Sequence, residues 1–162
     1  MKGLQLLAIV SVALLLGTTF THVLQMPSDL ALPDPLWWRA QHSPEPRLPM
    51  VGGPLELLTV GINLAVLTAA LSRPHYLFLS AGSALCLVGA FFVWVVFTEP
   101  VDVHLKHWLN GSLSPDAGDW RQQWEFSQLV RLLLHLAALL LLAASLLHLP
   151  LDERPERGIA HG

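Results

Sequence analysis

The sequence predicts an all-α protein, a four-helix transmembrane bundle with two long loops on the same side of the membrane. The chain of 162 residues contains four long apolar stretches, and only 13% of its residues are charged. A soluble domain is about 25% charged, and a helix needs about 20 apolar residues to cross the hydrocarbon core of a bilayer. The predicted spans are about 4–24, 54–72, 76–98 and 128–149.

The first predicted span contains no Asp, Glu, Lys or Arg. Lys2 and the apolar run after it resemble the start of a secretory signal peptide. The run continues past Leu16 to Leu24, however, and no clear small-x-small cleavage site follows it. We therefore expect an uncleaved first span, with a cleaved signal as the alternative. Pro27 is expected to end this helix, because proline removes a backbone donor and clashes with the preceding turn.

Prolines also bound the other spans. The second span is expected to begin at Pro54, because proline is favoured in the first turn of a helix, and a tight connection at 72–75 joins it to the third. The fourth span is expected to stop at Pro150. Residues 1–150 are thus predicted to form one membrane domain, and 151–162 a polar, disordered tail.

The number of spans determines which segments share a side of the membrane. The long segments 26–53 and 99–127 are separated by two spans, so they lie on one side, and the termini lie on the other. The last residues of the second long segment are expected to belong already to the fourth helix. Lys and Arg are spread evenly over the two sides, and only Lys2 favours a cytoplasmic N-terminus. We expect a multi-pass protein of a bacterial plasma membrane with cytoplasmic termini.

Composition excludes several kinds of partner and site. The net charge of −3 leaves no basic surface, so no nucleic-acid partner is expected. Cys86 is the single cysteine and cannot form an intrachain disulfide. Asp102, His104 and His107 have a metal-ligand spacing, but no further Cys or His lies nearby, so they are interpreted as interface residues and no metal is expected. The expected partners are the lipid bilayer and a small hydrophobic or aromatic molecule, and a homo-oligomer is left open.

The polar residues of the predicted helices fall on one face of each helix. Residues three, four or seven positions apart share a face, and polar groups in lipid are costly, so these faces should point into the bundle or toward its mouth. Most of them lie toward the long-loop end. They are Ser11, Thr18, His22 and Gln25 on the first span, Glu56, Thr59 and Asn63 on the second, Trp124, Gln128, Arg131 and His135 on the fourth, and Glu99 and Asp102 after the third. A polar and aromatic belt that only anchors the bundle is the alternative interpretation.

Several short motifs occur at the long-loop end of the spans. They are TEPVD at 98–102, DWRQQWE at 119–125 with Arg131 after it, H-x-x-Q-x-P at 22–27 and LW-x-x-x-Q at 36–41. These motifs resemble elements of the anthrone oxygenase-like family of small four-helix integral membrane proteins, most of which have no known function. Glu56 is similar to an acidic residue that opens the second helix in one bacterial branch of that family.

Three positions depart from the family pattern. Gln128 stands where the family usually has His, Gln25 where the bacterial branch has Glu, and Asp102 where the proline-containing segment usually ends in Asn. Glutamine cannot act as a general base near neutral pH. If the family His is the base, this chain has lost it.

The resemblance implies oxidation of an anthrone to an anthraquinone by dioxygen without a cofactor. Such a reaction needs an apolar slot, a base near the acidic C–H bond, and donors for the developing enolate oxygen. On this interpretation the catalytic residues are His22 and Arg131. The substrate-binding residues are Gln25, Trp37, Gln41, Glu56, Asn63, Glu99, Asp102, Trp120, Arg121, Trp124 and Gln128.

Two other classes of function stay open at this point. One is a non-catalytic membrane protein that binds a lipid or a quinone-like molecule, which the departure at Gln128 favours. The other is a haem-binding electron carrier with His22 and His135 as axial ligands. A transporter is disfavoured, because four spans would have to dimerise to build a pathway and no broken helix is evident.

Overall fold

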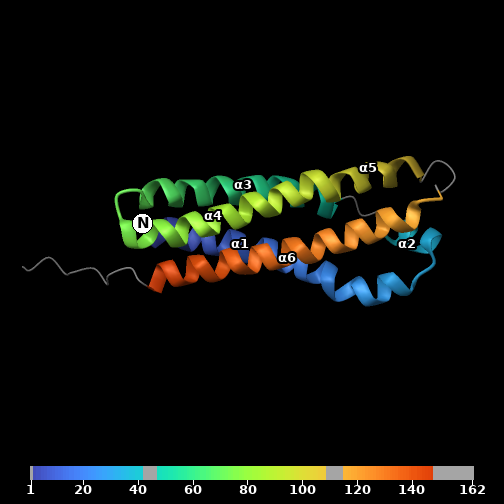
Figure 1. Ribbon diagram of the computed structural model, residues 1–162, viewed down its shortest axis with the longest axis horizontal. Coiled ribbons are helices and arrows are strands. Elements are labelled where there is room, and N and C mark those ends of the chain that lie inside the picture. The colour runs from blue at the N-terminus through green and yellow to red at the C-terminus, as the bar shows by residue number, and fades with distance from the viewer. Residues whose placement is uncertain (1, 42–46, 109–114, 148–162) are drawn as a thin grey trace, which may run out of the picture.

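Four long helices run side by side along one axis (Figure 1). The computed structural model describes residues 2–41, 47–108 and 115–147, without the side chains of 47–51, 75 and 105–107. The long helices are α1 (Lys2–Ala31), α3 (Arg47–Ala70), α4 (Pro74–Val93) and α6 (Ala117–Leu147). The shorter helices α2 (Asp34–Gln41) and α5 (Glu99–Trp108) lie at one end of the bundle. The predicted all-α, four-helix bundle is confirmed.

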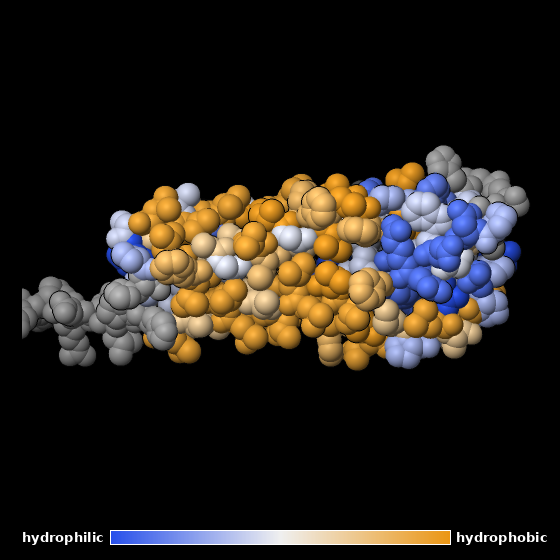
Figure 2. Space-filling view, viewed as in Figure 1, coloured by the Kyte–Doolittle hydropathy of each residue, from blue (hydrophilic) through white to orange (hydrophobic). Residues whose placement is uncertain are grey.

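The described helices include four that are long and apolar enough to cross a membrane, over Lys2–Ala31, Gly52–Ala70, Tyr76–His104 and Ala117–Leu147. Large apolar side chains cover the outside of the bundle; Phe78 is 80% exposed and Leu85 is 73% exposed. Figure 2 shows this hydrophobic surface along most of the length, with hydrophilic residues gathered at the end that carries α2 and α5. Such a surface is stable in contact with lipid rather than water, so the protein is an integral membrane protein in contact with the bilayer.

Two predicted helix boundaries at the polar end are wrong. The first helix continues through Pro27 to Ala31, and its last part is inclined to the rest (Figure 1). Pro54 does not open the second helix, because α3 begins at Arg47 and contains this proline, although the apolar span Gly52–Ala70 begins close to it. A proline within a helix leaves one carbonyl without its partner, and near the polar end water can satisfy that carbonyl. The predicted long loop 26–53 therefore contains much helix.

The third span also extends beyond its predicted end. A π-helical turn, η1 (Trp94–Thr98), joins α4 to α5, and the N–H of Glu99 donates to the carbonyl of Trp94, five residues back. The turn places Pro100 in the first turn of α5, where a missing N–H is tolerated. The predicted loop 99–127 thus contains α5 and the beginning of α6, and the prediction that its end belongs to the fourth helix is confirmed. Pro150 and the predicted tail 151–162 lie outside the described residues.

The bundle closes as a ring in which α6 packs against α1 and α4, and α3 packs against the same two helices. Gln5 lies against Ser145 and Thr19 against His135, so α1 and α6 are antiparallel. The centre is filled by small and branched side chains, which we call the apolar core cluster. Its buried members are Ala8, Val12, Val66, Leu87, Ala138 and Leu142.

The topology predicts opposite accessibility for the two ends of the bundle. Arg39 on α2 and Ser72 in the connection between α3 and α4 are both exposed. In a Cys86→Ser background, we expect a membrane-impermeant maleimide to label Arg39→Cys in intact cells, and Ser72→Cys only after the membrane is permeabilised. The reverse pattern would overturn the predicted cytoplasmic termini. Labelling of both in intact cells would contradict the four-span topology itself.

Candidate functional site

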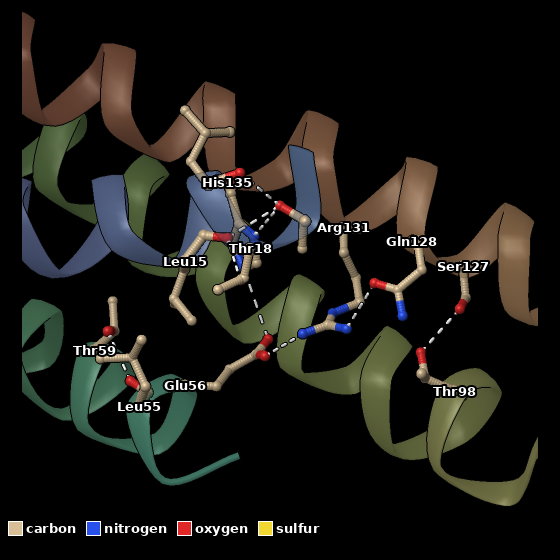
Figure 3. A network of polar contacts seen from close by, with 12 residues as sticks. Leu15, Thr18, Leu55, Glu56, Thr59, Thr98, Ser127, Gln128, Arg131 and His135 are labelled. Atoms are coloured by element: carbon tan, nitrogen blue, oxygen red, sulfur yellow. Dashed lines mark hydrogen bonds and ion pairs between the residues drawn. The ribbon is translucent and has the colours of Figure 1, made fainter. Parts of the chain in front are cut away.

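A buried polar network lies between α3 and α6 in the interior of the bundle (Figure 3). The Arg131 guanidinium donates through Nη2 to Oε2 of Glu56 and through Nη1 to Oε1 of Gln128, at 3.1 Å. Glu56 is 1% exposed and Arg131 is 8% exposed. A buried charge is strongly unfavourable unless it is paired, so each of these two residues depends on the other.

His135 extends this network to α1. Its Nδ1 is 3.3 Å from the hydroxyl oxygen of Thr19, and its Nε2 is 3.7 Å from Oε1 of Glu56. The imidazole is fully buried. We call Thr19, Glu56, Gln128, Arg131 and His135 the Glu56 network.

A second group of side chains lies at the polar end. We call its tryptophans, Trp37, Trp38 and Trp124, the aromatic cluster. Trp37 is fully buried, and its indole N–H donates to Oε1 of Glu125 at 3.0 Å. Its ring packs edge-on against Trp38 and Trp124, with centroid distances of 4.5 and 5.6 Å. The indole N–H of Trp124 donates to Oδ1 of Asp102 at 3.2 Å. These contacts join α2, α5 and α6.

His22 lies at the edge of the aromatic cluster. Its ring packs edge-on against Trp124, with the centroids 5.2 Å apart. The side chain is partly buried, and Arg131 is near enough to interact with it electrostatically. Among the described residues, none forms a hydrogen bond with the ring nitrogens of His22. His22 therefore differs from His135, whose two nitrogens both face protein groups.

Arg121 fastens the end of α1 and the start of α2 to α6. Its Nη1 donates to the carbonyl of Leu32 and to Oδ1 of Asp34, both at 2.9 Å, and its Nη2 donates to the carbonyl of Asp29. Gln41 donates to the Asp29 carboxylate from the other side, at 3.2 Å. Arg121 and Gln41, predicted to bind substrate, are thus engaged in holding this corner of the fold together.

Several other predicted site residues lie apart from these two groups. The amide of Asn63 accepts from the Ser83 hydroxyl at 3.1 Å and so joins α3 to α4. Trp120 packs against His104 on α5. Glu99 is partly buried at the start of α5.

The face predicted for the first span is partly wrong. Gln25 and Thr18 are exposed, whereas Thr19, which the pattern did not select, is buried at 1% exposure. Ser11 lies at the edge of the buried face rather than at its centre, so residues spaced from it turn outward. Gln5, buried and fourteen positions before Thr19, was the signal that could have located the correct face.

Glu125 is the other residue that sequence reasoning did not select. It belongs to the 119–125 motif but was not included among the predicted site residues, yet Glu125 is 2% exposed and its carboxylate is bonded to Trp37. Gln128, three positions later, lies on the predicted inward face of the fourth helix. Residues three positions apart share a helix face, so the spacing to Gln128 could have identified Glu125 as a buried residue.

No group of three or more His, Cys, Asp or Glu side chains that could hold a metal ion occurs among the described side chains. Asp102 accepts from Trp124, and the His104 ring packs against Trp108 and Trp120. The side chain of His107 lies outside the described residues. The different partners of His22 and His135 also give no support to a haem held between them.

Comparison with known proteins adds no relative. No protein-family model matches the chain, and no curated protein and no solved structure matches it. The resemblance to the anthrone oxygenase-like family therefore stays a prediction from the motifs.

Proposed function

We propose that the protein binds a small hydrophobic aromatic molecule at the polar end of the bundle, with His22 and Trp124 as its contacts. The observation that carries the proposal is the environment of His22. The imidazole is partly buried, no described residue bonds to it, and its nitrogens are not among the fully buried polar atoms. Its nitrogens are therefore available to a polar atom of a ligand.

The surroundings of His22 suit an aromatic ligand with one polar oxygen. Trp124 offers a ring edge or face for packing, which is worth about 0.5–1.5 kcal/mol beyond the area buried. Arg131 and Asp29 are both near enough to interact electrostatically with His22, with opposite signs, and a ligand oxygen that carries negative charge would be directed toward the Arg131 side. A hydrophobic molecule dissolved in the bilayer would reach this site along the lipid-facing surface.

Oxidation of the bound molecule by dioxygen is a second candidate, favoured by the same free imidazole. His22 would take a proton from the acidic C–H of an anthrone, and the resulting anion would transfer electrons to dioxygen. One anthrone and one dioxygen then give one anthraquinone and one water. Arg131 and Gln128 are bonded to each other and to Glu56, which leaves fewer donors for an oxyanion and ranks binding above turnover.

One experiment tests both candidates. Anthrone is added to the detergent-purified protein in air, and tryptophan fluorescence and quinone absorbance are recorded together. We expect saturable quenching, and an affinity about tenfold lower for His22→Phe, which keeps a ring against Trp124 but removes the nitrogens. Phe20→Leu, an exposed change on the same helix, is the matched control and should bind normally.

The outcomes separate the two candidates. Absence of saturable quenching, or equal affinity for His22→Phe and the unmodified protein, would overturn the binding proposal. Quinone formation above the protein-free rate that is lost in His22→Phe would support catalysis. Tight binding without such formation would leave the protein a non-catalytic binder.

A further inference from the structure

The Thr19 hydroxyl has more neighbours than its single hydrogen can serve. Its oxygen is 3.1 Å from the carbonyl of Leu15, 3.2 Å from that of Leu16 and 3.3 Å from Nδ1 of His135. A hydroxyl donates one hydrogen bond and accepts up to two. Thr19 can therefore donate to His135, or donate to a carbonyl of its own helix and accept from His135.

The other nitrogen of His135 faces a carboxylate. Nε2 lies 3.7 Å from Oε1 of Glu56, and neither atom has a hydrogen-bond partner in the described part of the chain. The second carboxylate oxygen of Glu56 is held by Arg131. A hydrogen on Nε2 is therefore directed at the negatively charged carboxylate. If Nε2 carried no hydrogen, its lone pair and Oε1 of Glu56 would be two acceptors facing each other in a buried site.

These contacts accommodate His135 in two charge states. In the neutral state Nε2 carries the hydrogen and Nδ1 accepts from the Thr19 hydroxyl. In the charged state Nδ1 also carries a hydrogen and donates to the Thr19 oxygen, whose own hydrogen then turns to the Leu15 carbonyl. The two states differ by the added proton and by a rotation of the hydroxyl, and no heavy atom has to move.

We propose that His135, Thr19 and Glu56 form a reversible proton-binding site inside the membrane-spanning bundle. The proposal does not depend on a ligand at His22. The site binds a proton, and the Thr19 hydroxyl rotates to suit the charge of the His135 ring. Intramembrane ionisable residues are often parts of proton pathways, because an unused charge there is costly.

The groups that face His135 come from each neighbouring helix. α3 contributes Glu56, whose negative charge favours the protonated ring, and α6 contributes Arg131, whose positive charge opposes it. α1 contributes the uncharged Thr19, and α4 contains no Asp, Glu, Lys or Arg. Cys86 of α4 packs against the apolar core cluster. Glu56 and Arg131 together are neutral, so the site carries one positive charge when the ring takes up a proton.

The test is nitrogen NMR of the full-length protein in detergent, with all eight histidines labelled with ¹⁵N. The His135 signals are identified by their loss in His135→Gln. We expect them to show the Nε2–H tautomer at high pH and, reversibly, a ring protonated on both nitrogens at low pH, over a scan from about pH 4 to 9. Unchanged signals over the scan, or a neutral Nδ1–H tautomer, would overturn the proposal.

A pair of threonine variants tests the adaptable hydroxyl. Thr19→Val keeps the shape but removes the only hydroxyl partner of Nδ1, so the titration of the ring should be displaced, while Glu56 still directs the neutral ring to the Nε2–H tautomer. Thr18→Val is the matched control: the Thr18 hydroxyl donates only to the Leu15 carbonyl among the described residues, so His135 should titrate as in the unmodified protein. If Thr19→Val leaves the titration unchanged, Thr19 has no part in the site and the proposal fails.

Discussion

Arg131→Met should lower the free energy of unfolding by roughly 3–5 kcal/mol, the cost of removing one partner from a buried ion pair. Glu56 is almost fully buried, and Arg131 is its charged hydrogen-bond donor. Without Arg131, the carboxylate keeps only His135, 3.7 Å away, as a neighbouring donor group. Reversible unfolding in mixed micelles, followed by circular dichroism, measures the loss.

Two further variants test whether the loss of stability in Arg131→Met comes from the buried ion pair. Glu56→Gln combined with Arg131→Met removes both charges, so most of the lost stability should return, because the penalty comes from an unpaired charge rather than from a missing attraction. Arg39→Met, on the exposed surface of α2, should stay within about 0.5 kcal/mol of the unmodified protein. A change for Arg131→Met as small as that of Arg39→Met would contradict the buried pair as a structural constraint.

Trp37→Ala should lower the free energy of unfolding by roughly 3–5 kcal/mol, as for other fully buried aromatic residues. The substitution removes the ring that packs against both Trp38 and Trp124. It also removes the indole N–H that donates to Glu125, whose other carboxylate oxygen is buried without a hydrogen-bond partner among the described residues. We expect α2 to separate from the bundle, which hydrogen exchange of its amides would detect.

Trp37→Phe separates the two contributions. Phenylalanine keeps much of the ring packing but removes the donor, so the expected loss is about 1–3 kcal/mol, the cost of an unsatisfied buried acceptor. Leu36→Ala, at the exposed neighbouring position, is the matched control and should have little effect. If Trp37→Ala is no more damaging than Leu36→Ala, the aromatic cluster does not hold α2 in place.

The bundle itself could be predicted from the sequence because a membrane imposes one requirement on every span. Each span must be helical and apolar over about 20 residues, and a run of this kind is visible without any knowledge of neighbouring helices. The ends of the helices could not be predicted in the same way. Pro27, Pro54 and Pro100 all lie within helical segments at the polar end, where water can bond to the carbonyls that proline leaves free.

The candidate site was predictable where one helix face is strongly marked. Gln128, Arg131 and His135 on the fourth span are all buried on α6, as their spacing indicated. Their partners depend on how helices distant in the sequence pack against one another. The spacing of residues within a single helix carries no information about that packing. Thr19 and Thr18 show the limit: both are threonines in the same apolar run, and only packing against α6 distinguishes them.

The apolar core cluster also determines how a membrane potential is distributed along the length of the bundle. No Asp, Glu, Lys or Arg occurs at 3–28, 57–72, 74–98 or 132–147, so Glu56 and Arg131 are the innermost permanent charges of the described chain and lie toward its polar end. An electric field falls mainly across the region that polarises least. Most of the potential should therefore drop across the stretch between the Glu56 network and the Gln5–Ser145 contact. A membrane voltage should therefore act mainly along the apolar length of the bundle and only weakly on Glu56 and Arg131.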